Sequence, residues 1–307
     1  MNKAPSLSIV IPTLNRYPYL INTVKDLSQQ SFKDFEIIIV DQTDRDQAQS
    51  VYFEGLDIKY YWSEIKSASL ARNIGIKEAR GKVILFIDDD LVIENKDFLK
   101  AHIDNYMDPK LCGVAGAVLD PKTTFRSKKH FLSKSLSYGW LFFPLNYDKE
   151  ALIGSGRSCN MSVRTAFAKS IKGMDERYVK GAFREEADFC SRLVKKFGAM
   201  KYDPKTYVIH LGAESGGIRN FITYSPIKAQ HHFNSMFYFT FKNVHIFHYP
   251  FHLISFLMMF FKKADIKRRP FIILELMRRS FLGIYSGLVM NRKGPLYLEN
   301  DLKDKEP

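Results

Sequence analysis

Three short apolar runs within the first 110 residues predict buried strands. They are Leu7–Pro12, Phe35–Asp41 and Lys82–Asp88, and each is apolar over nearly its whole length. Strands with one solvated face alternate apolar and polar residues, and these runs do not. Continuous apolar runs of this length are typical of strands covered on both faces, as in parallel sheets.

The segments between these runs have helical periodicity. Apolar residues recur at helical spacing in two segments: Tyr17, Leu20, Ile21, Val24 and Leu27, and then Leu70, Ala71, Ile74 and Ile76. Ser67 is the expected N-cap of the second helix. Strands and helices alternating in this order predict an α/β fold with a mostly parallel central sheet and flanking helices.

Residues suited to ligand binding follow each predicted strand. The segment Pro12–Asn15 ends the first strand, Asp41 ends the second, and Asp88–Asp90 end the third. In parallel sheets, ligands bind beyond the carboxyl ends of the strands. We therefore expect these residues to converge on one edge of the sheet.

Composition and charge narrow the class of protein. The 307 residues are 46% hydrophobic and 26% charged, with a formal net charge of +13, which indicates a globular chain and excludes disordered and collagen-like classes. The odd, widely spaced cysteines Cys112, Cys159 and Cys190 predict neither a disulfide framework nor a paired-thiol metal site. Residues 1–5 lack the pattern of a secretory signal, so we expect a cytoplasmic protein.

Positive charge concentrates toward the C-terminus. Residues 1–220 hold 33 basic and 27 acidic residues, whereas residues 221–293 hold 11 basic and 2 acidic residues and are rich in aromatics. We divide the chain into residues 1–220 and a basic, amphipathic helical C-terminal region, 221–307. That region is expected to lie on an anionic membrane surface, and the alternative is that its aromatics cover the core of the first domain. The run Val244–Phe261 is interrupted by histidines and a proline, so it is not expected to span a membrane, and no motif predicts nucleic acid as a partner.

The three successive aspartates suit a divalent cation. Asp88, Asp89 and Asp90 place carboxylates close together, where their repulsion is costly unless a cation is bound. Oxygen ligands of this kind favour Mg²⁺ or Mn²⁺. His210 ends a predicted strand before a glycine-containing loop and is a further candidate ligand. The alternatives are an acidic solvated turn and a packed histidine.

A second acidic group offers a candidate general base. Glu185, Glu186 and Asp188 begin a predicted helix that Gly198 ends. Acidic residues are also favoured in a first helical turn by the helix dipole. The alternative is therefore an ordinary helix start with a surface pair between Asp188 and Arg192.

Six motifs occur in an order that resembles one enzyme family: Ser8–Arg16, Glu36–Asp41, Ser69–Ile76, Ile87–Asp90, Cys159–Arg164 and Glu185–Arg192. Over residues 6–220 the chain resembles the family 2 inverting glycosyltransferases. The resemblance implies the glycosyltransferase-A fold. It also implies a nucleotide-sugar-binding half over about 1–110 and an acceptor-binding half over 111–220.

The resemblance implies donor-binding roles for residues at the strand ends. Pro12, Thr13 and Asn15 would border the nucleoside, and Asp41 would bind the base or ribose. Arg72 would lie near the diphosphate or help to position the aspartates.

The resemblance also implies a metal site. Asp88 and Asp90 would form the family's metal-binding element, with Asp90 the direct ligand of Mn²⁺ or Mg²⁺ and Asp88 on the ribose or in the metal shell. Asp89 would lie on the donor side, and Arg219 would assist the departing diphosphate.

The candidate base and the acceptor residues come from the second half. The family's base is usually the second residue of a Glu-Asp pair, which aligns with Glu186. Glutamate replaces aspartate here, so Glu185 and Asp188 remain candidates. Asn160 would belong to the strand below the acceptor, and Trp140 lies where acceptor contacts are expected, or else packs with neighbouring aromatics.

The function implied is metal-dependent, inverting transfer of a sugar from a nucleoside-diphosphate sugar to a hydroxyl of a glycan or lipid-linked acceptor. We expect this reaction in cell-surface polysaccharide synthesis, on the cytoplasmic face of the membrane. Two alternatives stay open. The run Ile84–Val92 also fits the signature of haloacid dehalogenase-like phosphatases, and a membrane-associated scaffold without catalysis would retain the same fold.

Overall fold

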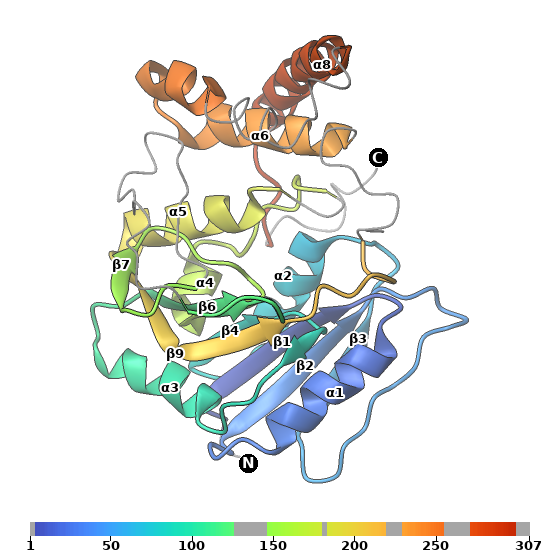
Figure 1. The fold of residues 1–307 in the computed structure, drawn as a ribbon, viewed down its shortest axis with the longest axis vertical. Coiled ribbons are helices and arrows are strands. Elements are labelled where there is room, and N and C mark those ends of the chain that lie inside the picture. The colour runs from blue at the N-terminus through green and yellow to red at the C-terminus, as the bar shows by residue number, and fades with distance from the viewer. Residues whose placement is uncertain (1–3, 126–145, 180–182, 219–228, 255–270, 299–307) are drawn as a thin grey trace.

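One mixed sheet lies between two layers of helices, and further helices near the C-terminus stack beyond one of these layers (Figure 1). The computed structural model describes residues 4–125, 146–179, 183–218, 229–254 and 271–298. Trp140 and Arg219, which the sequence analysis singled out, lie outside the described residues.

The bounds of the elements are as follows. The strands are β1 (Leu7–Thr13), β2 (Phe35–Asp41), β3 (Ile58–Trp62), β4 (Val83–Ile87), β5 (Leu91–Val92), β6 (Gly113–Leu119), β7 (Ala151–Ile153), β8 (Asn160–Arg164) and β9 (Met200–His210). The helices are α1 (Tyr17–Ser28), α2 (Ala68–Glu78), α3 (Phe98–Asp104), α4 (Thr165–Ser170), α5 (Glu185–Phe197), α6 (Gln230–Asn243) and α8 (Ile272–Arg292), with 3₁₀ turns η1 (Asn105–Met107) and η3 (Ile246–His248).

The local predictions near the N-terminus are confirmed. The three apolar runs form β1, β2 and β4, and the two periodic segments form α1 and α2. Ser67 caps α2, because its hydroxyl accepts the backbone N–H of Leu70 at 3.4 Å. Gly198 ends α5 with a φ of 100°, a conformation that glycine adopts without a steric penalty. One helical position differs, because Ile21 is 44% exposed.

The strand order is β3-β2-β1-β4-β8-β6-β9-β5, and β7 pairs with β9. The pairs β1–β2, β2–β3, β1–β4 and β6–β9 are parallel, and most paired residues belong to them, so the mostly parallel sheet is confirmed. β8 runs antiparallel between β4 and β6. Because Ile87 pairs with Asn160, the segment that precedes β8 lies beside the end of β4.

The strands are buried on both faces, as their composition indicated. Alternate residues of β1 belong to different cores: Ile9 and Ile11 pack with α1 and α3, and Val10 packs with α2, α4 and α5. Residues of β2 divide between the same two cores. Burial on both sides explains why these strands lack polar alternation.

The C-terminal helices pack on the rest of the protein through α6. Tyr238 and Phe239 of α6 are buried in a cluster with Tyr178 and Ala187, so these aromatics cover the domain below, which was the alternative interpretation of this region. α8 packs against α6 at Gly283 and Gly287, where a Cβ atom would approach Phe233 or Phe237 within 2.9 Å. The outer face of α8 stays exposed.

None of the described helices is both long enough and apolar enough to cross a membrane.

Candidate active site

The carboxyl ends of β1, β2 and β4 bring the expected residues to one edge of the sheet. β1 is central to this arrangement, because it pairs with both β2 and β4. Thr13 and Asp41 therefore end neighbouring strands, and Asp88 follows the next strand. The predicted convergence is confirmed for these residues.

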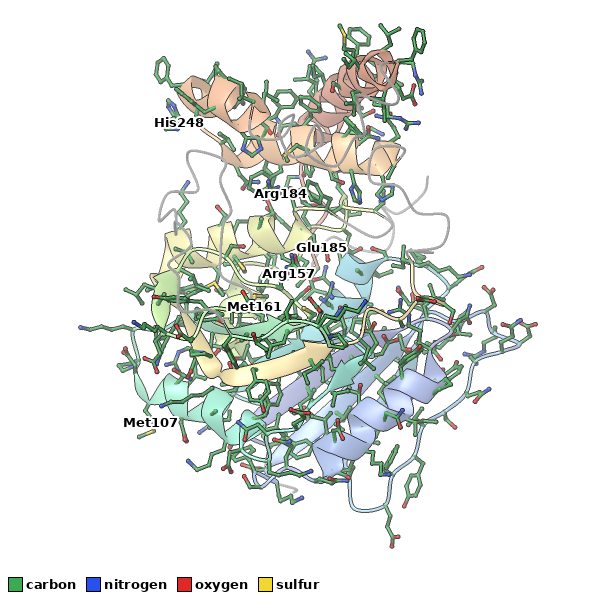
Figure 2. All side chains as sticks on the ribbon, viewed as in Figure 1. Met107, Arg157, Met161, Arg184, Glu185 and His248 are labelled. Carbon is green, nitrogen blue, oxygen red and sulfur yellow. The ribbon has the colours of Figure 1, made fainter. Side chains whose placement is uncertain are left out.

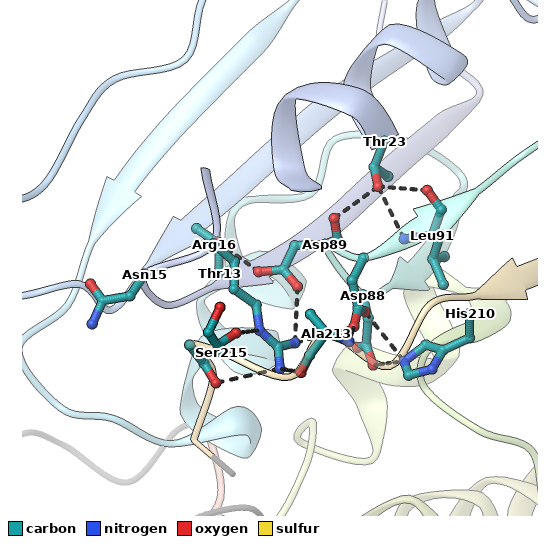
Figure 3. Close-up of polar contacts among 12 residues, drawn as sticks. Thr13, Asn15, Arg16, Thr23, Asp88, Asp89, Leu91, His210, Ala213 and Ser215 are labelled. Carbon is teal, nitrogen blue, oxygen red and sulfur yellow. Dashed lines mark hydrogen bonds and ion pairs between the residues drawn. The ribbon is translucent and has the colours of Figure 1, made fainter. Parts of the chain in front are cut away.

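Asp88, Asp90 and His210 form a group that could hold a metal ion. One ligand atom from each residue lies within 4.8 Å of the others. His210 Nε2 lies 3.3 Å from Asp90 Oδ1 and 3.6 Å from Asp88 Oδ2 (Figure 3). His210 reaches this position because β9 pairs with β5, directly after the aspartates.

The donor set fits a divalent cation. Asp90 is 1% exposed, and its Oδ1 accepts no hydrogen bond from the described residues. The contact of this oxygen with His210 Nε2 at 3.3 Å lacks hydrogen-bond geometry. A buried carboxylate oxygen without a hydrogen bond is costly unless a cation, either a protonated imidazole or a metal ion, faces it. Two carboxylates and one imidazole suit Mn²⁺ or Mg²⁺, with further positions left for oxygen ligands.

The electrostatics of His210 reflect the same cluster. Burial by itself would lower the pKa of His210, but the hydrogen bond to Asp88 and the charge of Asp90 raise it above its ordinary value. A proton on this imidazole and a metal ion compete for the same nitrogen. Metal binding here is therefore expected to release a proton.

Asp89 does not belong to this group, because its carboxylate contacts Thr13 and Arg16 instead. Its Oδ2 accepts the hydroxyl of Thr13 at 2.7 Å, and its Oδ1 lies 3.4 Å from Arg16 Nη1. Burial and the neighbouring charge of Asp90 raise the pKa of Asp89 to about 7. The hydrogen bond between Asp89 and Thr13 is a structural contact within the protein. Contact of either side chain with the nucleotide-sugar substrate stays a prediction.

Arg16 is a site residue that the sequence analysis quoted within a motif but gave no role. It lies 3.4 Å from both Asp89 and Asp90, and it donates to the backbone carbonyls of Ala213 and Ser215 (Figure 3). The N–H of Ala213 returns to Asp90 Oδ2 at 2.8 Å. Arg16 therefore holds the loop after β9 against the aspartates. The signal in the sequence was a cation directly after the first strand-end motif.

The end of β2 forms a second polar group. Asp41 is fully buried and accepts the hydroxyls of Tyr17 and Tyr60 at 2.5 Å and the N–H of Thr43 at 2.8 Å. The N–H of Asn15, which has a φ of 55°, donates to Thr43 Oγ1. Asp41 thus orders the loops beside β1 and β2, and direct contact of Asp41 with a nucleoside stays a prediction that requires one of these donors to move. Contact of Asn15 and of the partly buried Pro12 with the nucleotide-sugar substrate also stays a prediction.

Arg72 connects the aspartates to helix α5. Its guanidinium donates to Asp88 Oδ1 at 3.0 Å and to Glu185 Oε1 at 2.8 Å, and the side chain is only 6% exposed. Burial would lower the pKa of Arg72, but Glu185 and Asp88 raise it, so the residue stays a cation. α2 and α5 are therefore joined by a buried ion pair directly behind the metal-binding group.

The three candidate bases differ in their surroundings. Glu185 is committed to Arg72 and to the hydroxyl of Ser69 at 3.0 Å. Glu186 is partly exposed, accepts the N–H and hydroxyl of Ser158 at 2.9 and 2.7 Å, and has no cation within ion-pair distance among the described residues. Asp188 is fully buried. Glu186 is therefore the carboxylate of the three that is open to solvent and not neutralised.

The ion pair between Asp188 and Arg192 is present at 2.9 Å, but the expectation of a surface pair is wrong. Asp188 also binds Lys242 at 2.8 Å and the amide of Asn243 at 2.9 Å, both from α6. Burial would raise the pKa of Asp188, but Arg192 and Lys242 lower it below its ordinary value. Asp188 joins α5 to α6, because the C-terminal helices cover this part of α5.

Asn160 begins β8, as expected for the strand below the acceptor, but its side chain is fully buried. Its amide donates to the carbonyls of Ala117 and Thr206, and its Oδ1 lies 3.0 Å from His102 Nε2. Direct contact with an acceptor is not available to Asn160 in this structure. The family resemblance assigned Asn160 to the acceptor side, whereas tertiary packing uses its side chain to join β6, β8 and β9.

Solved structures with the same fold are glycosyltransferases. A mannosyltransferase of Pyrobaculum calidifontis, solved with GDP-Man and Mn²⁺, aligns over 95% of this chain and 88% of its own, with a TM-score of 0.58 and 12% identity. TarS 1–349 of Staphylococcus aureus, solved with UDP-GlcNAc, aligns over 95% of this chain and 93% of its own, with a TM-score of 0.59 and 19% identity. The structure therefore has the glycosyltransferase-A fold.

Residues 8–171, more than half of the chain, match the family model described as Glycosyl transferase family 2. The chain belongs to this family of enzymes, so the interpretation as a haloacid dehalogenase-like phosphatase is wrong.

Curated relatives align over a smaller part of the chain. The GalNAc(5)-diNAcBac-PP-undecaprenol beta-1,3-glucosyltransferase of Campylobacter jejuni is 34% identical over 28% of this chain and 30% of its own. The poly(ribitol-phosphate) beta-N-acetylglucosaminyltransferase TarS of Staphylococcus aureus is 33% identical over 32% of this chain and 19% of its own. The chain thus spans less than a third of the length of either relative.

Proposed function

We propose that this protein is a metal-dependent, inverting glycosyltransferase that moves a sugar from a nucleoside-diphosphate sugar to a hydroxyl of a glycan or lipid-linked acceptor. The observation that carries the proposal is one chain of contacts. The group Asp88, Asp90 and His210 is joined through Arg72 to Glu185, and the next residue is the accessible carboxylate Glu186. Metal ligands and a candidate base on one scaffold are the parts that such a transfer needs.

In the proposed mechanism, each charged group of the site has one role. Mn²⁺ or Mg²⁺ bound by Asp88, Asp90 and His210 would offset the charge of the diphosphate that leaves. Glu186 accepts the proton of the acceptor hydroxyl, which attacks the anomeric carbon from the face opposite the leaving group and inverts it. Ser158 holds the Glu186 carboxylate through two hydrogen bonds. Arg72 holds Asp88 in place.

The acceptor class is supported by relatives. The names of the two curated relatives place their acceptors on undecaprenyl diphosphate and on poly(ribitol phosphate). We extend this to the present chain as synthesis of a cell-surface polysaccharide. The names of the structural neighbours likewise support a nucleotide-sugar donor and Mn²⁺.

Peripheral attachment to the cytoplasmic face of a membrane is part of the proposal. Large apolar side chains of α8 recur at helical spacing and are exposed: Leu274, Met277, Phe281, Tyr285 and Leu288. The opposite face of α8 is held against α6. An exposed apolar stripe in a basic region matches a helix that lies in the plane of an anionic membrane.

Calorimetric titration tests the function. The protein is titrated with a panel of nucleoside diphosphates and nucleotide sugars, with and without Mn²⁺. Metal-dependent binding of one nucleotide, followed by its sugar appearing on an acceptor, supports the proposal. Absence of binding across the panel contradicts it and favours a scaffold without catalysis.

A further inference from the structure

The guanidinium of Arg184, directly before the helix that carries Glu186, has no hydrogen bond or ion pair to any described residue, and its Nε is buried without an acceptor. Only the backbone carbonyl of Arg184 is bonded there, because it accepts the N–H of Asp188 at 3.0 Å. Two other arginines of the interior bind carboxylates, although the Nε of Arg72 is also buried without an acceptor. Arg72 binds two carboxylates, and Arg192 binds Asp188 and two backbone carbonyls.

The surroundings of Arg184 are aromatic. Its guanidinium carbon lies 5.1 Å from the ring centre of Phe183 and 5.8 Å from that of the fully buried Phe239 on α6. Contacts of this kind use the charge of a guanidinium and accept no conventional hydrogen bond, so its N–H groups remain available for another ligand. Two aromatic contacts do not satisfy these donors, so the residue is prepared to accept an anion.

Electrostatics agree with this geometry. Burial lowers the pKa of Arg184 to about 10, and Tyr178 and then Glu186 oppose that shift only in part. The residue is still a cation at neutral pH. A partly buried cation that no described residue pairs with is costly, so its presence favours a negatively charged ligand.

The position of Arg184 favours an anionic ligand on the acceptor side of the site. Arg184 lies between α5 and α6, next to Glu185, whereas the aspartates lie at the edge of the sheet (Figures 2 and 3). Asp88 already has its own cation in Arg72. Arg184 has a φ of 75°, a left-handed conformation uncommon outside glycine, and this turn orients the residue directly before α5.

We propose that Arg184 binds a phosphate group of the acceptor, close to the hydroxyl that receives the sugar. The planar guanidinium fork matches phosphate oxygens, which can accept two N–H groups at once. The phosphate belongs either to a lipid headgroup or to the backbone of a phosphate-containing polymer. The inference rests on the proposed function, because an acceptor site is needed for it.

The test is calorimetric titration of the full chain, saturated with UDP and Mn²⁺, with three probes: farnesyl phosphate, glycerol 3-phosphate and farnesol. Wild type is compared with Arg184→Gln, Arg184→Lys and the control Arg278→Gln, which removes an exposed arginine from α8. We expect Arg184→Gln to weaken phosphate binding about tenfold or more. Arg184→Lys should lie between, and the control should match wild type.

The outcomes separate the two proposals. Failure of wild type to bind any nucleoside diphosphate of the panel counts against the transferase, whereas failure of UDP alone replaces UDP by the nucleotide that binds. In both cases the phosphate titrations of the nucleotide-free protein still report on Arg184. Equal phosphate affinity in wild type and Arg184→Gln overturns the inference, as does farnesol binding as tightly as farnesyl phosphate. Weaker binding of UDP to Arg184→Gln would move the residue to the donor side and overturns it too.

The probes also separate the sources of the phosphate. Binding of farnesyl phosphate alone supports a lipid headgroup, and equal binding of glycerol 3-phosphate supports a polymer phosphate. If Arg184→Gln does not unfold cooperatively, Arg184→Lys carries the test, because loss of the planar fork should weaken binding several-fold. Unchanged phosphate affinity in Arg184→Lys would then overturn the inference.

Discussion

Replacement of Glu186 by Gln isolates the proton-accepting role from the structural one. Glu186 Oε1 accepts two hydrogen bonds from Ser158, at 2.9 Å from the N–H and 2.7 Å from the hydroxyl. The amide oxygen of Gln can accept both, and no cation loses a partner. We therefore expect the free energy of unfolding to change by less than about 1 kcal/mol.

The catalytic effect should be much larger. A positioned general base contributes about 10²- to 10⁴-fold to a rate, so kcat should fall about 10³-fold, equivalent to about 4 kcal/mol. The assay measures sugar transfer and the affinity for the metal–nucleotide complex in the same preparation. Nucleotide affinity should stay within about twofold of wild type, because Glu186 contacts neither the aspartates nor Arg72.

The matched control is Glu185→Gln on the same helix. Glu185 is buried and neutralises Arg72, so its replacement should destabilise the protein by about 3 kcal/mol. Glu186→Gln is thus expected to lose turnover and keep its stability, whereas Glu185→Gln is expected to lose stability. Transfer by Glu186→Gln within tenfold of wild type would refute the assignment of the base.

Three further predictions concern the metal site, the buried ion pairs and the surface of α8. Asp90→Ala should abolish the Mn²⁺ dependence of nucleotide binding by calorimetry, and unchanged dependence would contradict the metal assignment. Lys242→Met leaves Asp188 and Asp175 without a shared cation and should cost about 3 kcal/mol in urea unfolding at pH 7. Because the folded pKa of Asp188 is below its ordinary value, its stabilisation is present at neutral pH and is lost as the pH falls through that lowered pKa, so the variant should unfold at a higher pH than wild type during acid titration. Phe281→Asp should weaken sedimentation with phosphatidylglycerol vesicles about tenfold or more. Met107→Asp should not, because Met107 is more exposed, at 86% against 73% for Phe281, but lies far from α8 (Figures 1 and 2).

Features that depend on neighbouring residues along the chain could be predicted from the sequence. The strands β1, β2 and β4, the N-cap Ser67 and the C-cap Gly198 follow from apolar runs, hydrogen-bonding side chains and backbone freedom, each set within a few residues. The meeting of strand-end residues also followed, because parallel strands share one edge.

Residues that act across the fold could not be assigned from the sequence. Arg16 and the loop after β9 are 197 residues or more apart in the chain, and nothing local indicates that the guanidinium binds that loop. Asp188 and Asn160 stand in motifs that suggest chemistry, yet long-range packing buries both and gives them structural partners.

The sequence alone therefore determined the fold class, the family and the edge of the sheet where the site lies, since periodicity and strand direction are local properties. Only the tertiary structure decided which carboxylate is accessible. Glu185, Glu186 and Asp188 share one helical turn and similar chemistry, but α2 supplies a cation to the first and α6 supplies a cation to the third. Which charge is neutralised depends on which helix packs beside it, and that contact is made by residues far away in the chain.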